Sequence, residues 1–275
     1  MIAPALTNTL LPTGGSAPMA AASMLAAKIN LQLIATSGKP MLLGIGGAQG
    51  SGKTTLAALL ALQCQQQGLR ARAVSLDDYY LSAMQRADLA SRVHPLLRQR
   101  GVPGTHDVTR ALADVTALRQ HQPVGFPCFD KASDNVAPAK PAAQFDVIIF
   151  EGWCLGIPAQ MPGSLHTAVN QLEQFQDPQL VWRNYVNQQL GGVYQQLWQQ
   201  FDALVWLQAP DWPTVCRWRL QQEQQLWQQQ GQGMTETELA RFMLSFQRLT
   251  LHGMQQMPQL ANLVIRLNPE RIPQD

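Results

Sequence analysis

Mostly apolar runs of five or six residues recur along the chain, at positions 41–46, 72–76, 145–150, 203–207 and 263–267. Runs of this length and composition are typical of strands that are buried in a parallel sheet. Patterns with helical spacing separate them, at about 55–67, 82–92, 108–120, 177–201, 211–230 and 235–252. This alternation predicts an α/β fold: a five-stranded parallel sheet with helices on both faces.

Local signals predict where some of these helices begin or break. Asp107 stands where its side chain can cap the helix that follows it. Asp177-Pro178 has the order of a cap followed by a first-turn proline, which predicts a helix start. Gly191-Gly192 predicts an interruption of that helix, because glycine weakens a helix interior.

The spacing of the elements predicts the domain organisation. Residues 1–37 are expected to form an irregular segment and a helix packed on the core, and residues 38–275 the main domain. Two long stretches between the predicted strands, about 81–141 and 152–176, are expected to be insertions that bind a substrate. A helical lid is expected at about 212–235, ahead of the break at Gly231 and Gly233.

Composition excludes several classes of protein. The 275 residues carry a net charge of only +2 and no basic run, so no nucleic-acid partner is expected. The four cysteines lie far apart without a C-x-x-C pair, which fits neither a zinc site nor a secreted disulfide framework. No signal peptide or membrane-spanning run is apparent, and we expect a cytoplasmic monomer or homodimer that acts on a small molecule.

The strongest motif directly follows the first apolar run. It matches the phosphate-binding pattern G-x-x-x-x-G-K-[ST], with a second threonine after it, in the residues Gly47, Ala48, Gln49, Gly50, Ser51, Gly52, Lys53, Thr54 and Thr55. Glycines let backbone N–H groups converge on an anion, and the next helix points its positive end at the same place. Lys53 would reach the terminal phosphates of ATP, and the Thr54 hydroxyl would bind Mg²⁺.

Two acids stand at the ends of later strands, where open α/β sheets bind ligands. Asp77 lies 24 residues past Lys53 and could accept the proton of a substrate hydroxyl; alternatively it shapes a turn, a part that Asp78 could also play. Glu151 follows a fully apolar strand and could hold Mg²⁺, or form an unrelated ion pair.

Arginines on the expected lid could neutralise charge on the phosphates. Arg217 and Arg219 are these candidates, although surface arginines on a helix are common. The candidates for contact with the substrate each have a structural alternative such as a helix cap, an exposed loop position or an internal ion pair; they are Tyr79, His106, Asp107, Lys131 and Arg183.

Taken together, these motifs resemble the D-glycerate 3-kinase-like branch of P-loop kinases, related to phosphoribulokinase, uridine kinase and pantothenate kinase. Besides the phosphate loop, the resemblance is carried across roughly 38–268 by the segments 75–81 (S-L-D-D-Y-Y-L), 100–107 (R-G-V-P-G-T-H-D), 129–131 (F-D-K), 150–153 (F-E-G-W) and 218–223 (W-R-L-Q-Q-E). The phosphate loop alone is unspecific, whereas the combination of R-G-x-P-G-T-H-D, F-D-K and E-G-W is much more specific.

The resemblance implies ATP-dependent phosphorylation of a hydroxyl on a small molecule, with D-glycerate as the first expectation. It also implies the strand order 2-3-1-4-5, Asp77 as catalytic base, and an arginine-bearing lid at Arg217 and Arg219. One segment departs from the family: residues 132–136 read Ala-Ser-Asp-Asn-Val, where plant-type members carry a Gly- and Arg-rich run. The alternatives are a related kinase for a nucleoside, pantothenate or a sugar phosphate, and a non-catalytic ATP-binding regulatory module.

Overall fold

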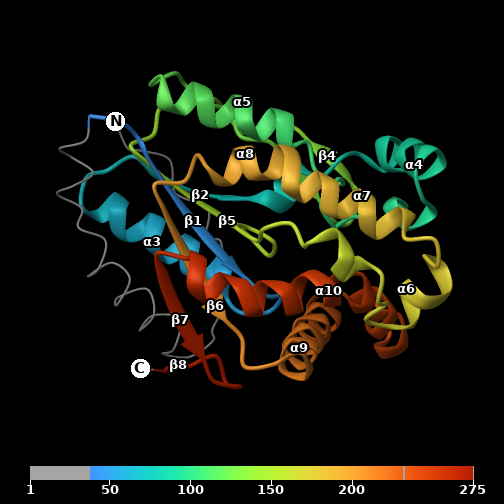
Figure 1. Ribbon diagram of the computed structural model, residues 1–275. Coiled ribbons are helices and arrows are strands. Elements are labelled where there is room, and N and C mark those ends of the chain that lie inside the picture. Colours follow the sequence, from blue (N-terminus) through green and yellow to red (C-terminus); the bar gives the residue numbers. More distant parts are fainter. Residues whose placement is uncertain (1–37, 232, 275) are drawn as a thin grey trace.

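A six-stranded sheet forms the centre of the protein, whose computed structural model describes residues 38–231 and 233–274 (Figure 1). The strands stand in the order β2-β5-β1-β6-β7-β8. The first five pair in parallel, and β8 pairs antiparallel with β7. Their bounds are β1 Met41–Gly47, β2 Ala71–Ser75, β5 Val147–Gly152, β6 Ala203–Gln208, β7 Leu263–Leu267 and β8 Pro273–Gln274.

Helices cover both faces of this sheet. In Figure 1, α3 lies on one side, and α5, α8 and α10 lie on the other. The longer helices are α3 Lys53–Gln66, α4 Ala83–Arg92, α5 Val108–Arg119, α7 Val181–Gln189, α9 Trp212–Gln230 and α10 Glu236–Leu260. Shorter helical segments are η1 Leu76–Tyr79, η2 Pro95–Arg98, η3 Pro162–Leu165, α6 Gln171–Gln176, η4 Leu190–Tyr194 and α8 Gln195–Trp198.

The central strands are apolar because both of their faces are covered. Every residue of β5 is buried, and so is every residue of β1 except its first. Burial of such strands supplies most of the favourable free energy of a fold of this kind, at roughly 25 cal/mol per Å² of apolar surface. The covered sheet holds the carboxyl ends of β1, β2 and β5 together at one edge, where the polar residues collect.

The predicted count of five strands is wrong, because a sixth strand, β8, extends the sheet. The five parallel strands are those that the apolar runs indicated. The segment that forms β8 is Pro273–Gln274, which is too short and too polar to give a strand pattern. A second, two-stranded sheet was also missed: β3 Cys128–Asp130 and β4 Asn135–Ala137 form an antiparallel hairpin inside the insertion expected at about 81–141.

Helix boundaries near Asp177 differ from the prediction. Asp177 ends α6 instead of starting a helix at Pro178, and α7 begins at Val181. The carboxylate still caps α7 from upstream, because it accepts from the backbone N–H of Trp182 at 2.9 Å. The predicted interruption at Gly191-Gly192 is confirmed: the π-helical segment η4 lies there, and Gly192 has the non-helical angles φ −99° and ψ −109°.

The helix expected within residues 1–37 lies outside the described residues. No helix among residues 38–231 and 233–274 combines the length and apolar character that a membrane crossing requires.

Candidate active site

The turn between β1 and α3 has the form of an anion-binding loop. Gly50 and Gly52 adopt left-handed φ values of 75° and 91°, and Gly52 directly precedes α3. A Cβ at Gly50 would lie 2.6 Å from the Cβ of Trp218 on α9, so a side chain cannot fit there. An anion in this turn would meet the N-terminal amides of α3 and the positive end of its dipole.

Buried polar atoms of the same loop have no partner. The side-chain nitrogen and oxygen of Gln49 and the Oγ of Ser51 are buried without a hydrogen bond. Such groups are rare in proteins. A phosphate would accept hydrogen bonds from the Ser51 hydroxyl and the Gln49 amide nitrogen, so the chemistry of the loop fits this group.

Lys53 lies folded against the loop. It is 8% exposed, and its Nζ donates to the Ala48 carbonyl at 2.8 Å. Burial lowers the pKa of Lys53, and the charges of Glu151 and Asp77 oppose that effect. The ammonium group therefore shares one electrostatic environment with both acids that the sequence singled out.

Thr54 and Glu151 meet directly across the sheet edge. The Thr54 hydroxyl donates to Glu151 Oε1 at 3.0 Å, and Glu151 is 6% exposed. Burial raises the pKa of Glu151, while Lys53 acts in the opposite direction. In the described part of the chain no cluster of three or more His, Cys, Asp or Glu side chains could hold a metal. Mg²⁺ needs less, because it is usually held by one or two protein oxygens together with phosphates and water.

The Asp77 carboxylate is held between two donors. Tyr80 donates its hydroxyl to Oδ1 at 2.9 Å, and Lys131 donates to Oδ2 at 2.6 Å. Burial would raise the pKa of Asp77, but the charge and hydrogen bond of Lys131, together with His106 and Tyr80, bring it below its ordinary value. Asp77 is thus an ionised acceptor next to the phosphate loop, which is the state that a general base requires.

The neighbouring tyrosines point to different places. Tyr79 is buried, stacks on Phe150 and donates to Asp114 on α5 at 2.9 Å, so it belongs to the core. The structure therefore does not bring Tyr79 to the site, and the tyrosine that contacts Asp77 is Tyr80. Sequence reasoning missed this because the turn η1 decides which of two adjacent tyrosines faces the site.

His106 lies behind Tyr80. Its ring stacks on the Tyr80 ring at a centroid distance of 4.5 Å, and its Nδ1 is 2.7 Å from the Tyr194 hydroxyl. Burial lowers the pKa of His106 to about 4, so the ring is neutral at pH 7. Its Nε2 is buried without a partner. His106 therefore lies near Asp77 through its contact with Tyr80.

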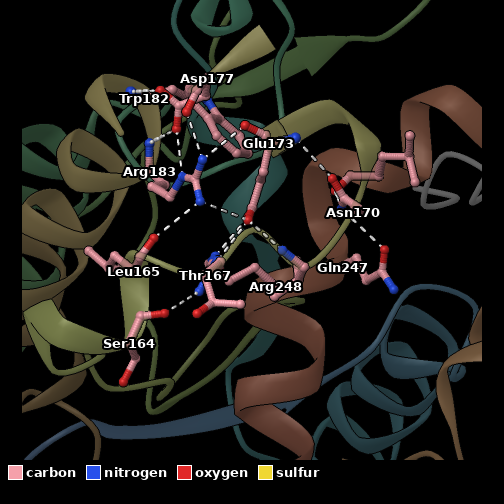
Figure 2. Close-up of polar contacts among 12 residues, drawn as sticks. Ser164, Leu165, Thr167, Asn170, Glu173, Asp177, Trp182, Arg183, Gln247 and Arg248 are labelled. Carbon is pink, nitrogen blue, oxygen red and sulfur yellow. Dashed lines mark hydrogen bonds and ion pairs between the residues drawn. The ribbon is translucent and has the colours of Figure 1, made fainter. Parts of the chain in front are cut away.

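Two other predicted substrate residues are used by the fold. Asp107 caps α5, since its Oδ1 accepts from the Arg110 N–H at 3.0 Å. Arg183 is 3% exposed, and its guanidinium binds Asp177 at 2.8 Å and the Glu173 carbonyl at 2.9 Å, inside the network shown in Figure 2. The structural alternative holds for both, so neither is brought to the site.

The arginines of α9 differ in availability. Arg217 is exposed and donates to the Thr214 hydroxyl at 2.8 Å. Arg219 is paired with Glu223 at 2.6 Å. Both lie next to Trp218, the residue that packs on the phosphate loop. Helix α9 is therefore placed against the loop, with the Arg219 guanidinium held by its own helix.

Arg271 is a neighbour of the phosphate loop that the sequence did not reveal. Its Nε donates to the Gly50 carbonyl at 2.6 Å, and its guanidinium lies 5.1 Å from the centre of the Trp218 ring. It follows the last parallel strand and has the positive φ of 66°. No pattern near position 271 marks such a contact, because it depends on how the last turn of the chain returns to the sheet.

The fold and this site define the class of protein: a parallel α/β sheet with a glycine loop, a buried lysine and strand-end acids is the arrangement of a P-loop phosphotransferase. No family model matches the chain. The chain is 33% identical over 220 residues to an uncharacterized kinase, mug58, of Schizosaccharomyces pombe, which covers 74% of this chain and 78% of that protein.

Two further proteins place the chain more closely. The chloroplastic D-glycerate 3-kinase of Arabidopsis thaliana is 30% identical over 217 residues, covering 74% of this chain but only 45% of the longer plant protein. The structure of D-glycerate 3-kinase from Cryptococcus neoformans superposes with a TM-score of 0.75 at 26% identity, covering 95% of this chain and 99% of that one. The chain belongs to the D-glycerate 3-kinase-like family of P-loop kinases, and it is an ATP-dependent kinase.

Proposed function

We propose that this kinase transfers the γ-phosphoryl group of ATP to a hydroxyl of D-glycerate, forming 3-phosphoglycerate. The observation that carries the proposal is the Asp77 carboxylate, ionised and held by Tyr80 and Lys131 in the electrostatic environment of Lys53 and Glu151. An enzyme that only hydrolyses ATP has no need of such a base facing an acceptor. The names of the two D-glycerate 3-kinases support the choice of acceptor.

The phosphate loop binds the nucleotide in this proposal. The amides of residues 47–55 and the Lys53 ammonium surround the phosphates, which requires Lys53 to leave the Ala48 carbonyl. Thr54 and Glu151 are the residues that would hold Mg²⁺, and the ion would neutralise charge on the transferred phosphoryl group. The unpartnered Ser51 hydroxyl and Gln49 amide nitrogen gain acceptors when phosphate binds.

Asp77 acts on the acceptor. The carboxylate takes the proton of the attacking hydroxyl while the oxygen forms its bond to the γ-phosphorus and ADP departs with the bridging oxygen. Tyr80 fixes the orientation of the carboxylate, and Lys131 must release it for the acceptor to approach. Most of the rate enhancement comes from positioning and charge stabilisation.

The segments that the sequence predicts to be insertions and a lid have roles in this proposed mechanism. The insertions at about 81–141 and 152–176 hold the acceptor, and the segment at about 212–235 closes over the phosphates. Arg217 would then turn from Thr214 toward the nucleotide, whereas Arg219 would first have to leave Glu223. Closure of this kind excludes water from the transfer step.

The test is a screen of hydroxylated metabolites for stimulated release of ADP. D-glycerate should stimulate it strongly, and nucleosides, pantothenate and sugar phosphates should not. Lys53→Ala should abolish transfer and weaken nucleotide binding, whereas Asp77→Asn should abolish transfer and leave nucleotide binding intact. Slow hydrolysis that no small molecule stimulates, together with tolerance of Asp77→Asn, would show a regulatory ATP-binding module instead.

A further inference from the structure

Two arginines hold one carboxylate next to the proposed base. Arg86 binds Asp134 Oδ2 and Arg100 binds Asp134 Oδ1, so each oxygen takes one guanidinium. We call Arg86 and Arg100 the arginine clamp. Their side chains are 2% and 29% exposed, whereas that of Asp134 is 41% exposed. The cations are thus set into the protein, and the anion comes from its surface.

The arginine clamp is held in place by contacts that do not involve Asp134. Arg86 donates to the carbonyls of Leu81 at 2.5 Å and Arg98 at 3.1 Å. The guanidinium groups of Arg86 and Arg100 lie 5.9 and 5.6 Å from the centre of the Phe129 ring. Arg86 would therefore keep its position if another carboxylate took the place of Asp134, and Arg100 would keep its contact with the Phe129 ring.

Asp134, in contrast, is held by the arginine clamp itself. It lies at the end of the exposed turn 131–134 between β3 and β4, with φ of 52°. Aspartate adopts this left-handed conformation more readily than most residues other than glycine, so the backbone carries little strain here. The two ion pairs with the arginine clamp hold the side chain, so a competing carboxylate in the clamp would release the turn.

The arginine clamp and the base are joined through two residues. Phe129 packs edge-on against Tyr80 at 5.3 Å, and Tyr80 donates to Asp77. Lys131 binds Asp77 through its ammonium group, while its carbonyl accepts from Arg100 at 3.4 Å. A small molecule with a hydroxyl at Asp77 could therefore extend an anionic group toward Arg100.

We propose that the arginine clamp binds the carboxylate of the acceptor, and that Asp134 is an internal stand-in which leaves when the acid enters. A planar carboxylate with one oxygen on each guanidinium reproduces the contacts that Asp134 now makes. Two cations face a single anion there, so the local charge favours occupation of the arginine clamp by a carboxylate. The inference rests on the proposed kinase function, and it makes the acceptor a hydroxy acid.

The stand-in also links binding to activation of the base. Asp134 and Lys131 lie on the same short turn, one bound to the arginine clamp and the other to Asp77. Entry of the acid displaces the turn, and Lys131 then leaves Asp77. The base becomes free only when an acceptor is present, which limits wasteful attack of water on ATP.

Binding measurements without turnover test the subsite. Calorimetry in the presence of a non-hydrolysable ATP analogue should show that D-glycerate and D-lactate bind, and that the uncharged glycerol and 1,2-propanediol do not. D-lactate has the carboxylate but lacks the hydroxyl to be phosphorylated, so it should inhibit competitively against D-glycerate. Arg100→Met should weaken the binding of both acids about 10-fold to 100-fold, the scale of a charge-assisted hydrogen bond, and Arg100→Lys should restore part of it.

Asp134→Asn tests the stand-in. It removes the competing charge, so both acids should bind severalfold more tightly. Asp88→Asn is the matched control, because it removes the same charge from an exposed ion pair with Arg92 on the helix that carries Arg86. This control should leave acid binding unchanged.

The outcomes separate the two proposals. Unchanged acid binding in Arg100→Met overturns the subsite, and unchanged or weaker binding in Asp134→Asn overturns the stand-in. Acids that bind as described but never stimulate ADP release would retain the subsite and refute the glycerate kinase assignment. Phosphorylation of D-glycerate with an unchanged KM in Arg100→Met would retain the glycerate kinase assignment and refute the subsite.

Discussion

Two groups of ion pairs in this protein join acidic to basic side chains but differ in how exposed their carboxylates are. The buried network joins Glu173, Asp177, Arg183 and Arg248, all 6% exposed or less, and it is electrically balanced (Figure 2). Arg248 binds both oxygens of Glu173, at 2.7 and 2.6 Å. The remaining donors bind backbone carbonyls such as those of Thr167 and Leu165.

The ion pairs at the active site are more exposed to solvent than those of the buried network. The acids that close them, Asp77 and Asp134, are 28% and 41% exposed, and Lys131 is 59% exposed. A carboxylate in the buried network cannot leave without stranding a charge away from water. A pair near the surface separates at small cost, because water replaces the partner. Buried ion pairs therefore fix the fold, whereas an ion pair with a half-exposed carboxylate can exchange that carboxylate for a ligand.

The largest effect is expected from the base. Asp77→Asn should lower kcat by about 10² to 10⁴-fold, the contribution typical of general base catalysis. The thermal unfolding temperature should change little, because this carboxylate is not part of the buried network. Steady-state kinetics and thermal melting measure the two quantities. Asp146→Asn, at the opposite end of β5, is a control that removes a carboxylate paired with the exposed Arg70. Near-normal turnover in Asp77→Asn would contradict the assignment.

The second-largest effect is expected on the free energy of unfolding and not on activity. Glu173→Gln leaves Arg183 and Arg248 without their shared carboxylate, which should reduce the free energy of unfolding by about 3–5 kcal/mol. Denaturant titration measures this change, and kcat below the unfolding temperature should remain that of the wild type. A small loss, like that expected for the exposed pair in Asp88→Asn, would show that the network does not fix the fold.

The adjacent tyrosines give a smaller, paired test. Tyr80→Phe removes the hydroxyl that orients Asp77, so kcat should fall about tenfold, equivalent to about 1.4 kcal/mol. Tyr79→Phe removes only the bond to Asp114, so the free energy of unfolding should fall by about 1 kcal/mol with kcat unchanged. The assignment of one tyrosine to the site and the other to the core fails if the two effects are exchanged.

The smallest effect concerns pH. The pKa of Asp77 lies below its ordinary value: burial would raise it, but Lys131, together with His106 and Tyr80, outweighs that effect. Activity should therefore persist as pH falls and be lost only when pH passes through this depressed pKa. Lys131→Met removes the largest opposing influence, so the pKa should rise and the loss of kcat/KM should begin at higher pH. A pH profile of kcat/KM measures the shift, with Lys140→Met as a control, and an unmoved acidic limb would refute the role of Lys131.

The sequence by itself determined the five parallel strands, the phosphate loop and the two strand-end acids. Each of these depends on local pattern: apolar runs for buried strands, glycines for a turn with positive φ, and an acid directly after a strand. Thr54 and Glu151 lie 97 residues apart, yet the sequence could place both at one edge of the sheet because carboxyl ends of parallel strands share an edge.

Only the tertiary structure decided which side chains face the site. Tyr79 lies in the core, whereas Tyr80 contacts Asp77. Arg183 belongs to the buried network. Arg86 and Arg100 both bind Asp134. These outcomes depend on the direction of a turn or on contacts between residues 34 and 48 positions apart. Local pattern carries no information on either, because the free energy that selects them arises only when distant segments pack together.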